Sequence, residues 1–232
     1  MPERALGDDR ARAALHALHD KGLNFDPPAE DADLEAGGWR LDDYCQPLPA
    51  EPPGVPVANG SWETAKRLML AYEFADPDII HAVYEDDSPL EGRDMLLKAR
   101  FWGLSFDLGV RVGAVVDETR DLGGRGARVW GWGYRTLQGH LEAGQMDYEI
   151  WKWLDNGEVE FRIRAYSRPA AIPNPVVRLG FRLLGRREQL KFARQACERM
   201  ARLTAEELGT PPPGKPLERA AESITVETRE PG

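Results

Sequence analysis

Residues 133–151, GYRTLQGHLEAGQMDYEIW, join two stretches in which apolar and polar residues alternate. Gly139 and Gly144 lie between these stretches and favour a change of chain direction. The simplest interpretation is two adjacent antiparallel strands with the connection LQGHLEAG between them. The connection also contains His140, one of four histidines in the chain, so this stretch bears on function as well as on fold.

The alternation of apolar and polar residues extends well beyond this stretch. It predicts a block of strands over residues 94–104, 106–117, 126–136, 145–154 and 158–167. Turn residues separate them, for example the two glycines at 123–124 and the sequence DNG at 155–157. One more strand, around GGWRLDDY, is expected to complete the sheet.

Helical periodicity occurs before and after this block of strands. A helix is expected to begin with Ser61 as its N-cap. A second short helix is predicted over residues 75–85, with Asp76 as its cap and Pro77 as its first helical residue. The longest helical pattern spans residues 175–207, and a short helix is also expected within residues 8–22.

This order of elements predicts an α+β fold, because the strands come in one block rather than alternating with helices. We expect a curved antiparallel sheet around a long C-terminal helix, an arrangement similar to the START/Bet v 1-like helix-grip fold. The helix-grip domain would span residues 39–208. An acidic N-terminal extension, residues 1–38, would precede it, and a disordered tail, residues 209–232, would follow it.

Composition limits the classes of function. The chain has 232 residues, of which 42% are hydrophobic and 30% are charged, as in ordinary globular domains. A formal net charge of −9 argues against a general nucleic-acid-binding protein, because phosphate contacts require a basic surface. No run approaches the roughly 20 apolar residues of a membrane span, and MPERALGDDR does not resemble a signal peptide, so we expect a cytoplasmic protein. Two distant cysteines and four scattered histidines indicate reduced thiols, no metal site and no cofactor.

Several short motifs resemble the uncharacterised DUF1990 (UPF0548) family, whose pattern is approximately Y-G-T-L-x-G-H-x-E-x-G-E-E-x-F followed by F-S-R-P. The chain follows this pattern at Tyr134, Thr136, Leu137, Gly139, His140, Glu142 and Gly144, and again at Tyr166, Ser167, Arg168 and Pro169. The sequence SWETAKRLML matches as well, and the resemblance covers roughly residues 40–205. The chain departs from the pattern at Arg135, at Gln145 and Met146, and at YCQPLP. The resemblance implies the helix-grip fold and carries no established activity.

His140 and Glu142 are the candidate catalytic residues. The carboxylate of Glu142 could fix the imidazole tautomer, so that the two form an acid–base pair. Alternatively, the His140 ring hydrogen-bonds the main chain and holds the turn, which is the interpretation that we favour. Arg168, beside the strand-ending Pro169, is expected near this turn, holding Glu142 or a carbonyl group, or facing an anionic ligand.

One alternating set of strand residues is apolar throughout and is expected to face the long helix. Its members are Leu97, Ala99, Phe101, Val110, Val112, Ala114, Val129, Gly131, Gly133, Tyr148, Ile150, Phe161, Ile163 and Ala165. Several are small, which leaves room either for close helix packing or for a cavity. The fold resemblance favours a cavity for a small hydrophobic molecule. The expected ligand-binding residues are Tyr134, Arg135, Tyr148, Arg168 and Phe181.

The opposite face of the predicted sheet contains five of the seven tryptophans, interleaved with arginines, as cation–π stacking requires. Residues 1–53 hold five Lys/Arg and twelve Asp/Glu, a balance of −7, and we expect this segment to cover that face. A homodimer is the alternative cover. Residues 174–199 hold seven Lys/Arg and two Glu, a balance of +5. That basic helix is either a membrane-surface contact or, as we favour, a solvated face that neutralises the acidic segment.

Three hypotheses for the function remain open. The leading one is a protein that binds a small hydrophobic or amphipathic molecule between the sheet and the C-terminal helix. The second is an enzyme that uses His140 and Glu142 for proton transfer in the same cavity. The third is a structural or interaction protein without a pocket.

Overall fold

The computed structural model describes residues 9–28, 34, 37–85, 87–101, 104–171 and 175–218. The side chains of residues 9–10, 101 and 175–184 lie outside this description. The expected ligand contact of Phe181 and the end of the expected disordered tail, residues 219–232, therefore fall outside the described part of the chain.

Within the described residues, eight strands form one antiparallel sheet in the order β2-β3-β4-β5-β6-β7-β1-β8. The strands are β1 (Arg40–Leu48), β2 (Ile80–Val83), β3 (Asp94–Phe101), β4 (Leu104–Leu122), β5 (Arg125–Thr136), β6 (Glu142–Trp153), β7 (Val159–Pro169) and β8 (Leu217–Glu218). Consecutive strands from β2 to β7 are neighbours, which explains why alternation and turn residues were sufficient to predict this block. The strand expected around GGWRLDDY is β1, which pairs with β7.

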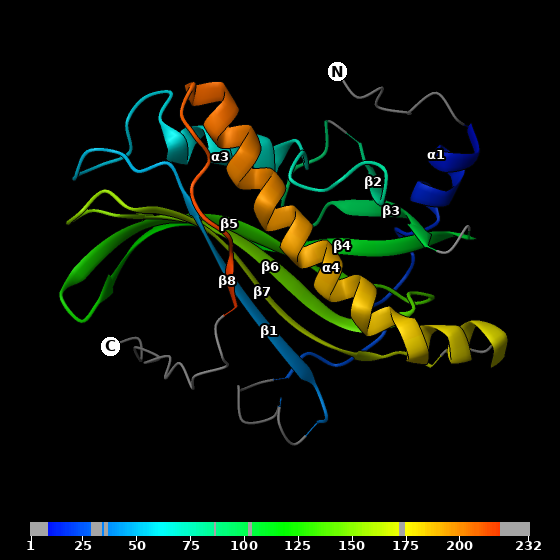
Figure 1. Cartoon of the computed structure of the whole chain (residues 1–232). Coiled ribbons are helices and arrows are strands. Elements are labelled where there is room, and N and C mark those ends of the chain that lie inside the picture. Colours follow the sequence, from blue (N-terminus) through cyan, green and yellow to red (C-terminus); the bar gives the residue numbers. More distant parts are fainter. Residues whose placement is uncertain are drawn as a thin grey trace, which may run out of the picture.

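The long helix α4 (Pro175–Leu208) crosses one face of the curved sheet diagonally, and α3 (Ser61–Leu70) covers the same face near one end (Figure 1). We call this face of the sheet the inner face and the opposite face the outer face. The main core lies between the inner face and α4. The helix contributes Phe192, Ala193, Ala196, Cys197 and Met200 to this core. The α+β helix-grip arrangement expected from the sequence is thus confirmed.

The helix predicted over residues 75–85 is wrong. Asp76 and Pro77 instead form a turn, in which the Asp78 N–H donates to Asp76 Oδ1 at 3.0 Å. The chain then continues as β2, which pairs with β3 at the edge of the sheet. The β-branched residues Ile79 and Ile80 suit a strand, and pairing with β3 outweighs the helix-start signal.

The N-terminus of α3 also differs from the expected one. Gly60 is the N-cap, and no side chain caps the helix locally, while Ser61 is buried inside the first turn. The carboxylate of Glu51 replaces the local cap, because its Oε1 accepts a hydrogen bond from the Trp62 N–H at 2.8 Å. Glu51 also forms a buried ion pair with Lys152 of β6, with Nζ and Oε2 2.5 Å apart. The loop before α3 is thereby held to the sheet.

The face assignment predicted for β5 is wrong by one residue. Trp132 pairs with Tyr148, and Trp130 pairs with Ile150, so both tryptophans lie on the inner face, in the main core. Directly paired residues share a face of the sheet. Burial of two indoles removes far more apolar surface from water than burial of the glycines next to them.

Gly133 lies on the outer face instead, where a Cβ atom would stand 1.9 Å from Asp147 Oδ1. In β4, one extra residue between Val112 and Val115 shifts the register against β5. Ala114, expected to face the helix, is consequently exposed. The misassigned inner-face positions are therefore Ala114, Val129, Gly131 and Gly133.

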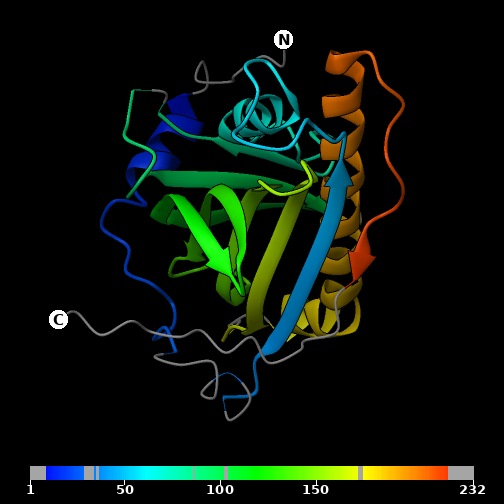
Figure 2. The ribbon, with the colours of Figure 1, turned by 90° about the vertical axis from the view of Figure 1, so that its left-hand side faces the viewer.

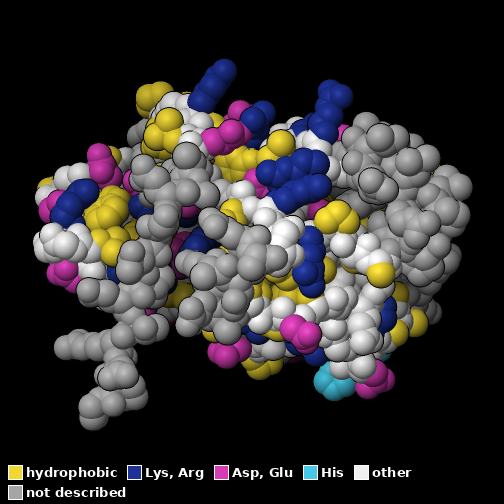
Figure 3. Space-filling model, turned by 90° about the horizontal axis from the view of Figure 1, so that it is seen from below, with side chains coloured by type: hydrophobic (Ala, Val, Ile, Leu, Met, Phe, Trp, Pro, Cys, Tyr) yellow, Lys and Arg dark blue, Asp and Glu magenta, His cyan; other side chains and the backbone are white. Residues whose placement is uncertain are grey.

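Trp151 and Trp153 do lie on the outer face, and arginines stack on them as the interleaved sequence predicts. The guanidinium carbon of Arg162 lies 3.9 Å from the ring centroid of Trp151, and that of Arg125 lies 4.3 Å from the ring centroid of Trp153. Both indoles are nearly buried by these contacts and by their neighbours in the strands. Figure 3, which views the molecule from below, shows basic side chains lying among hydrophobic ones on the described surface.

The N-terminal segment covers other parts of the outer face. Phe25 and Trp39 pack edge-to-face on Tyr166, with ring centroids 6.1 and 5.2 Å away. The helix α1 (Asp9–His16) packs through Leu15 against Leu96 of β3. Figure 2 shows α1 and the connection after it on the side of the sheet away from α4. The segment thus lies on the outer face as expected, but it packs on Tyr166 and Leu96, whereas arginines stack on the tryptophans of β6 that it was expected to cover.

The start of the predicted tail is ordered by contacts with the domain. Leu217 and Glu218 form β8, which pairs with Cys45 and Tyr44 of β1. Arg194 of α4 forms an ion pair with Glu218, which explains part of the helix's positive charge. Residues 209–218 therefore differ from the disordered tail expected from the sequence.

Candidate functional site

The turn between β5 and β6 places His140 at the end of the sheet, as the sequence predicts. Gly139 adopts a φ of +91°, which L-residues rarely accept, and the His140 N–H donates to Leu137 O at 3.0 Å. The imidazole Nδ1 lies 3.0 Å from both the main-chain N and the main-chain O of Glu142. Burial lowers the pKa of His140 to about 4, so the ring is neutral at physiological pH. Ring and main chain together hold the turn closed.

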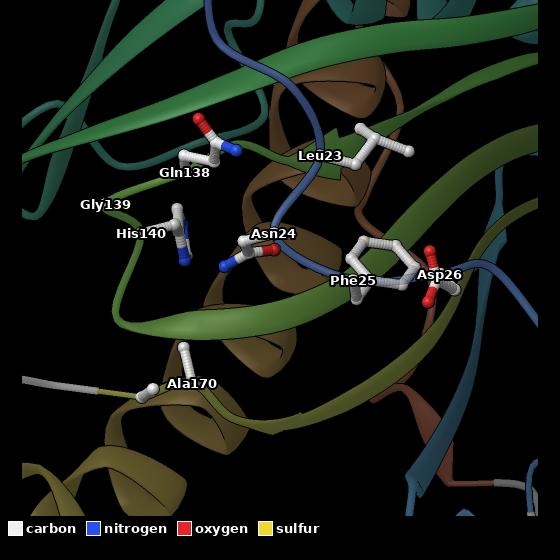
Figure 4. A pocket seen from close by; sticks show the side chains of 9 residues that line it. Leu23, Asn24, Phe25, Asp26, Gln138, Gly139, His140 and Ala170 are labelled. Atoms are coloured by element: carbon white, nitrogen blue, oxygen red, sulfur yellow. The ribbon is translucent and has the colours of Figure 1, made fainter.

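A hollow of about 430 Å³ opens beside this turn (Figure 4). Its lining combines the turn with the N-terminal segment, and includes Asn24, Phe25, Gln138, His140 and Ala170. Asn24 joins the two parts, because its amide donates to Glu142 O at 2.7 Å and its Oδ1 accepts from the Thr136 hydroxyl at 2.6 Å. Figure 4 shows the side chains of His140 and Asn24 on the same side of the hollow.

The carboxylate of Glu142 contacts α4 rather than the imidazole. Gln189 of α4 donates through Nε2 to Glu142 Oε2, and also to the hydroxyl of Ser167 at 3.1 Å. Burial raises the pKa of Glu142 to about 7, despite the opposing charges of Arg40 and Arg186. Glu142 therefore reaches the helix–sheet interface, whereas His140 reaches the hollow. The two candidate catalytic side chains serve different places.

Arg135 and Arg168 lie on the outer face. Arg135 donates to Gln145 Oε1 at 2.8 Å. Arg168 stacks over Trp39, with its guanidinium carbon 4.3 Å from the ring centroid, and donates to Gly37 O at 3.2 Å. Arg168 thus holds the N-terminal segment, and its partner carbonyl is not in the His140 turn as we had expected.

Tyr134 and Tyr148, two more of the expected ligand residues, meet on the inner face. The Tyr148 hydroxyl lies 3.2 Å from the Tyr134 hydroxyl and 2.9 Å from Met146 Sδ, and it donates its one hydrogen to either of them. Tyr72, immediately after α3, brings a third hydroxyl close to these two. Burial raises the pKa of all three phenols, so each remains a neutral hydrogen-bond donor. The four expected ligand residues whose side chains the structure describes are therefore split between the two faces of the sheet.

Several polar atoms near these tyrosines are buried and lack a hydrogen-bond partner in the described part of the chain. They include Trp132 Nε1 and Tyr72 Oη. The Trp132 ring lies against both Tyr72 and Tyr148, with ring centroids 6.2 and 5.5 Å away. Tyr72 also has a φ of +57°, a left-handed conformation that is costly for a bulky residue. Unpaired buried groups and backbone strain in one place are typical of binding sites.

The sequence pattern described as "Domain of unknown function (DUF1990)" matches residues 29–199. The chain belongs to the DUF1990 family. No curated protein sequence matches the chain. Among the solved structures that match is the crystal structure of Ara h 8.0201, with a TM-score of 0.43 and 9% sequence identity. That alignment covers 75% of this chain and 100% of the other.

The residues on which the DUF1990 resemblance rests largely shape the turn. Thr136 Oγ1 accepts a hydrogen bond from the Gly144 N–H at 2.9 Å, which closes the base of the connection. Leu137 is fully buried under α1, and Gly139 provides the positive φ. In this DUF1990 domain the motif therefore has a structural role first, while Glu142 and Ser167 contact Gln189 of α4.

Sequence reasoning missed Tyr72, Trp132 and Gln189. For Trp132 a signal was available, since Tyr148 was already placed inward and the two residues are paired in the sheet. Tyr72 follows a helix end whose geometry depends on a left-handed residue, and Gln189 is one of many polar residues on a long helix. No local sequence signal distinguishes Tyr72 or Gln189.

The described residues of this domain contain neither a metal-ligand cluster nor a membrane-spanning helix. Among them, no three His, Cys, Asp or Glu side chains lie close enough to hold a metal ion. None of the described helices combines the length and apolar character that crossing a membrane requires. Cys45 and Cys197 are both buried and unbridged.

Proposed function

We propose that this DUF1990 domain binds a small hydrophobic or amphipathic molecule between the sheet and α4. The observation that carries the proposal is the unpaired Nε1 of Trp132, a residue that is 3% exposed and belongs to the core between the inner face and the helices. An unsatisfied buried donor costs about 1–3 kcal/mol, and most buried donors have a partner. A bound molecule that accepts this hydrogen bond would remove the cost.

The surroundings of Trp132 support a site that rearranges to admit a ligand. Met146 and Met200 both belong to the interface, and methionine side chains repack more easily than branched ones. Ala193 and Ala196 of α4 have small side chains that fill little of the space between the helix and the sheet. From Tyr148, polar contacts continue through Tyr134 and Met146, and Glu142 and Gln189 lie farther along the same face.

Native mass spectrometry of protein purified without detergent tests this proposal. We expect a fraction of the protein to carry a bound small molecule, and Trp132→Phe to lose it. Trp151→Phe, which changes a tryptophan on the outer face, is the matched control and should retain the bound molecule. Absence of bound molecules, together with no binding of neutral apolar dyes, would contradict the proposal and favour a structural role without a pocket.

The hollow beside His140 favours an acid–base enzyme as the second candidate function. His140 would then act through Nε2, because Nδ1 is engaged with the main chain of Glu142. The Glu142 carboxylate is bound by Gln189, so it does not orient the ring as a catalytic dyad requires. Loss of ligand turnover in His140→Ala, at unchanged ligand affinity, would place this candidate first.

A further inference from the structure

We infer that the ligand of the sheet–helix site presents a neutral hydrogen-bond acceptor, such as a ketone, ester or ether oxygen, to Trp132 and Tyr72. This inference rests on the proposed function and specifies the chemistry of the ligand's polar end. It assigns the two residues the role of head-group recognition at the end of the site beneath α3.

The unpaired groups at this place are donors. An indole Nε1 donates and never accepts, so only an acceptor atom can satisfy Trp132. The Tyr72 hydroxyl, in a side chain that is 7% exposed, lies close to the hydroxyls of Tyr134 and Tyr148 but has no hydrogen bond of ordinary geometry. Tyr148 uses its own hydrogen on Tyr134 or on Met146 Sδ. Trp132 and Tyr72, whose ring centroids are 6.2 Å apart, therefore each keep a hydrogen-bond donor for a ligand.

Three cations described on the inner side of the sheet or on α4 are engaged by other protein groups, which argues for a neutral acceptor rather than an anion. Arg199 of α4 donates to the main-chain carbonyl of Glu73, next to Tyr72, at 2.7 Å. Lys152, the buried cation on the inner side of β6, is bound by Glu51. Arg186 of α4 is bound by both oxygens of Asp42. An anion without a paired cation is strongly disfavoured in such a buried place.

A ligand cation held by the aromatic rings is less well supported. The rings pack directly on one another, since Tyr148 lies 4.6 Å from Phe74 and 6.2 Å from Phe161, measured between centroids. An aromatic cage for a cation requires ring faces that surround a space. A cation would also leave the Trp132 N–H unpaired.

Four fluorescent naphthalene probes that share one 6-dimethylamino ring system test the inference. The first has a 2-propionyl group and is a neutral ketone, and the second has a 2-propyl group and no acceptor at that position. The third has a 2-carboxylate group, and the fourth a trimethylammonium group. Dissociation constants are measured by titration of the full-length protein, its Trp132→Phe and Tyr72→Phe variants, and the Trp151→Phe control.

We expect the ketone to bind about tenfold more tightly than the propyl compound, as one well-formed hydrogen bond allows. Trp132→Phe and Tyr72→Phe should each reduce this preference severalfold and leave the affinity for the propyl compound unchanged. Trp151→Phe should keep the full preference. Each variant keeps an aromatic ring and is expected to fold with a wild-type melting temperature. Two variants are used so that the test still stands if one of them does not fold.

Equal affinities for the ketone and the propyl compound would overturn the inference while leaving the proposed function standing. The same holds if the preference persists in both variants, or if the carboxylate or the ammonium compound binds most tightly. If none of the four probes binds, the proposed function fails together with the inference.

Discussion

Replacing Glu142 by glutamine should make the protein more stable at pH 8 and leave its stability nearly unchanged at pH 5. Burial raises the pKa of this carboxyl from 4.5 to about 7 in the folded protein. Between these two pH values the folded state holds a proton that the unfolded chain has released. Stability contributed by this proton is complete below pH 4.5 and is lost as pH rises through 7.

The size of the effect follows from the shift in pKa. Each pKa unit corresponds to about 1.4 kcal/mol, so a shift from 4.5 to about 7 makes the charged carboxylate cost roughly 3 kcal/mol at pH 8. Glutamine has nearly the same shape, never ionises, and its carbonyl can still accept the hydrogen bond from Gln189. The variant should therefore gain up to roughly 3 kcal/mol relative to wild type at pH 8.

The assay is urea unfolding followed by tryptophan fluorescence at pH 5, 6, 7 and 8. Asp147→Asn is the matched control, because burial raises the pKa of that carboxyl from 3.8 to about 6 on the outer face of the sheet. Its gain should be complete near pH 7, whereas the gain of Glu142→Gln should still grow between pH 7 and 8. A constant difference between Glu142→Gln and wild type from pH 5 to 8 would refute the reasoning.

Three further changes test other parts of the structure. His140→Ala should lower the free energy of unfolding by about 1–3 kcal/mol near pH 7 in urea titrations, because the Glu142 main chain loses its partner. Folding lowers the pKa of the imidazole, so the stability of the wild type should fall as the pH drops from 6.5 to 4. This fall should be smaller in the variant, which lacks the imidazole. Lys152→Met should lower the free energy of unfolding by about 3–5 kcal/mol, because Glu51 is left buried without its cation. Adding Glu51→Gln to this variant should recover part of the loss, and purely additive losses would contradict a direct ion pair. Deleting residues 1–36 should lower the melting temperature and solubility, because α1 leaves Leu96 uncovered; an equally stable, soluble truncation would show that this segment is not a cover.

An element could be predicted where the residues that cause it lie within the element or next to it in the sequence. The strands β3 to β7 depend on alternation and on turns such as the one at Gly139, and both are readable in a single stretch of sequence. The segment before β2 carries a helix-start signal at Asp76, yet it forms a strand because β3 is available at its side. The cap of α3 comes from Glu51, eleven positions before the residue whose N–H it binds, so no local capping pattern reveals it.

The candidate site shows the same division. The turn with His140 could be predicted, because glycines and a strand-ending proline mark it in the sequence. The grouping of Arg135 and Arg168 with Tyr134 and Tyr148 was wrong, because residues that are neighbours in sequence lie on opposite faces of a strand. Trp132 was placed on the outer face by an error of one residue, and such an error transfers a whole set of side chains.

The type and order of nearly all elements, the family and the helix-grip class could be predicted from the chain alone, since these depend on periodicity and on turn-forming residues. The buried face of β5 is set by tertiary contacts, because it depends on pairing with Tyr148 and on one extra residue in β4. Folding also brings the rings of Tyr72 and Trp132 together from separate elements. Their unpaired atoms become unusual only after folding has removed them from water, and for that reason no local pattern in the chain could indicate the site.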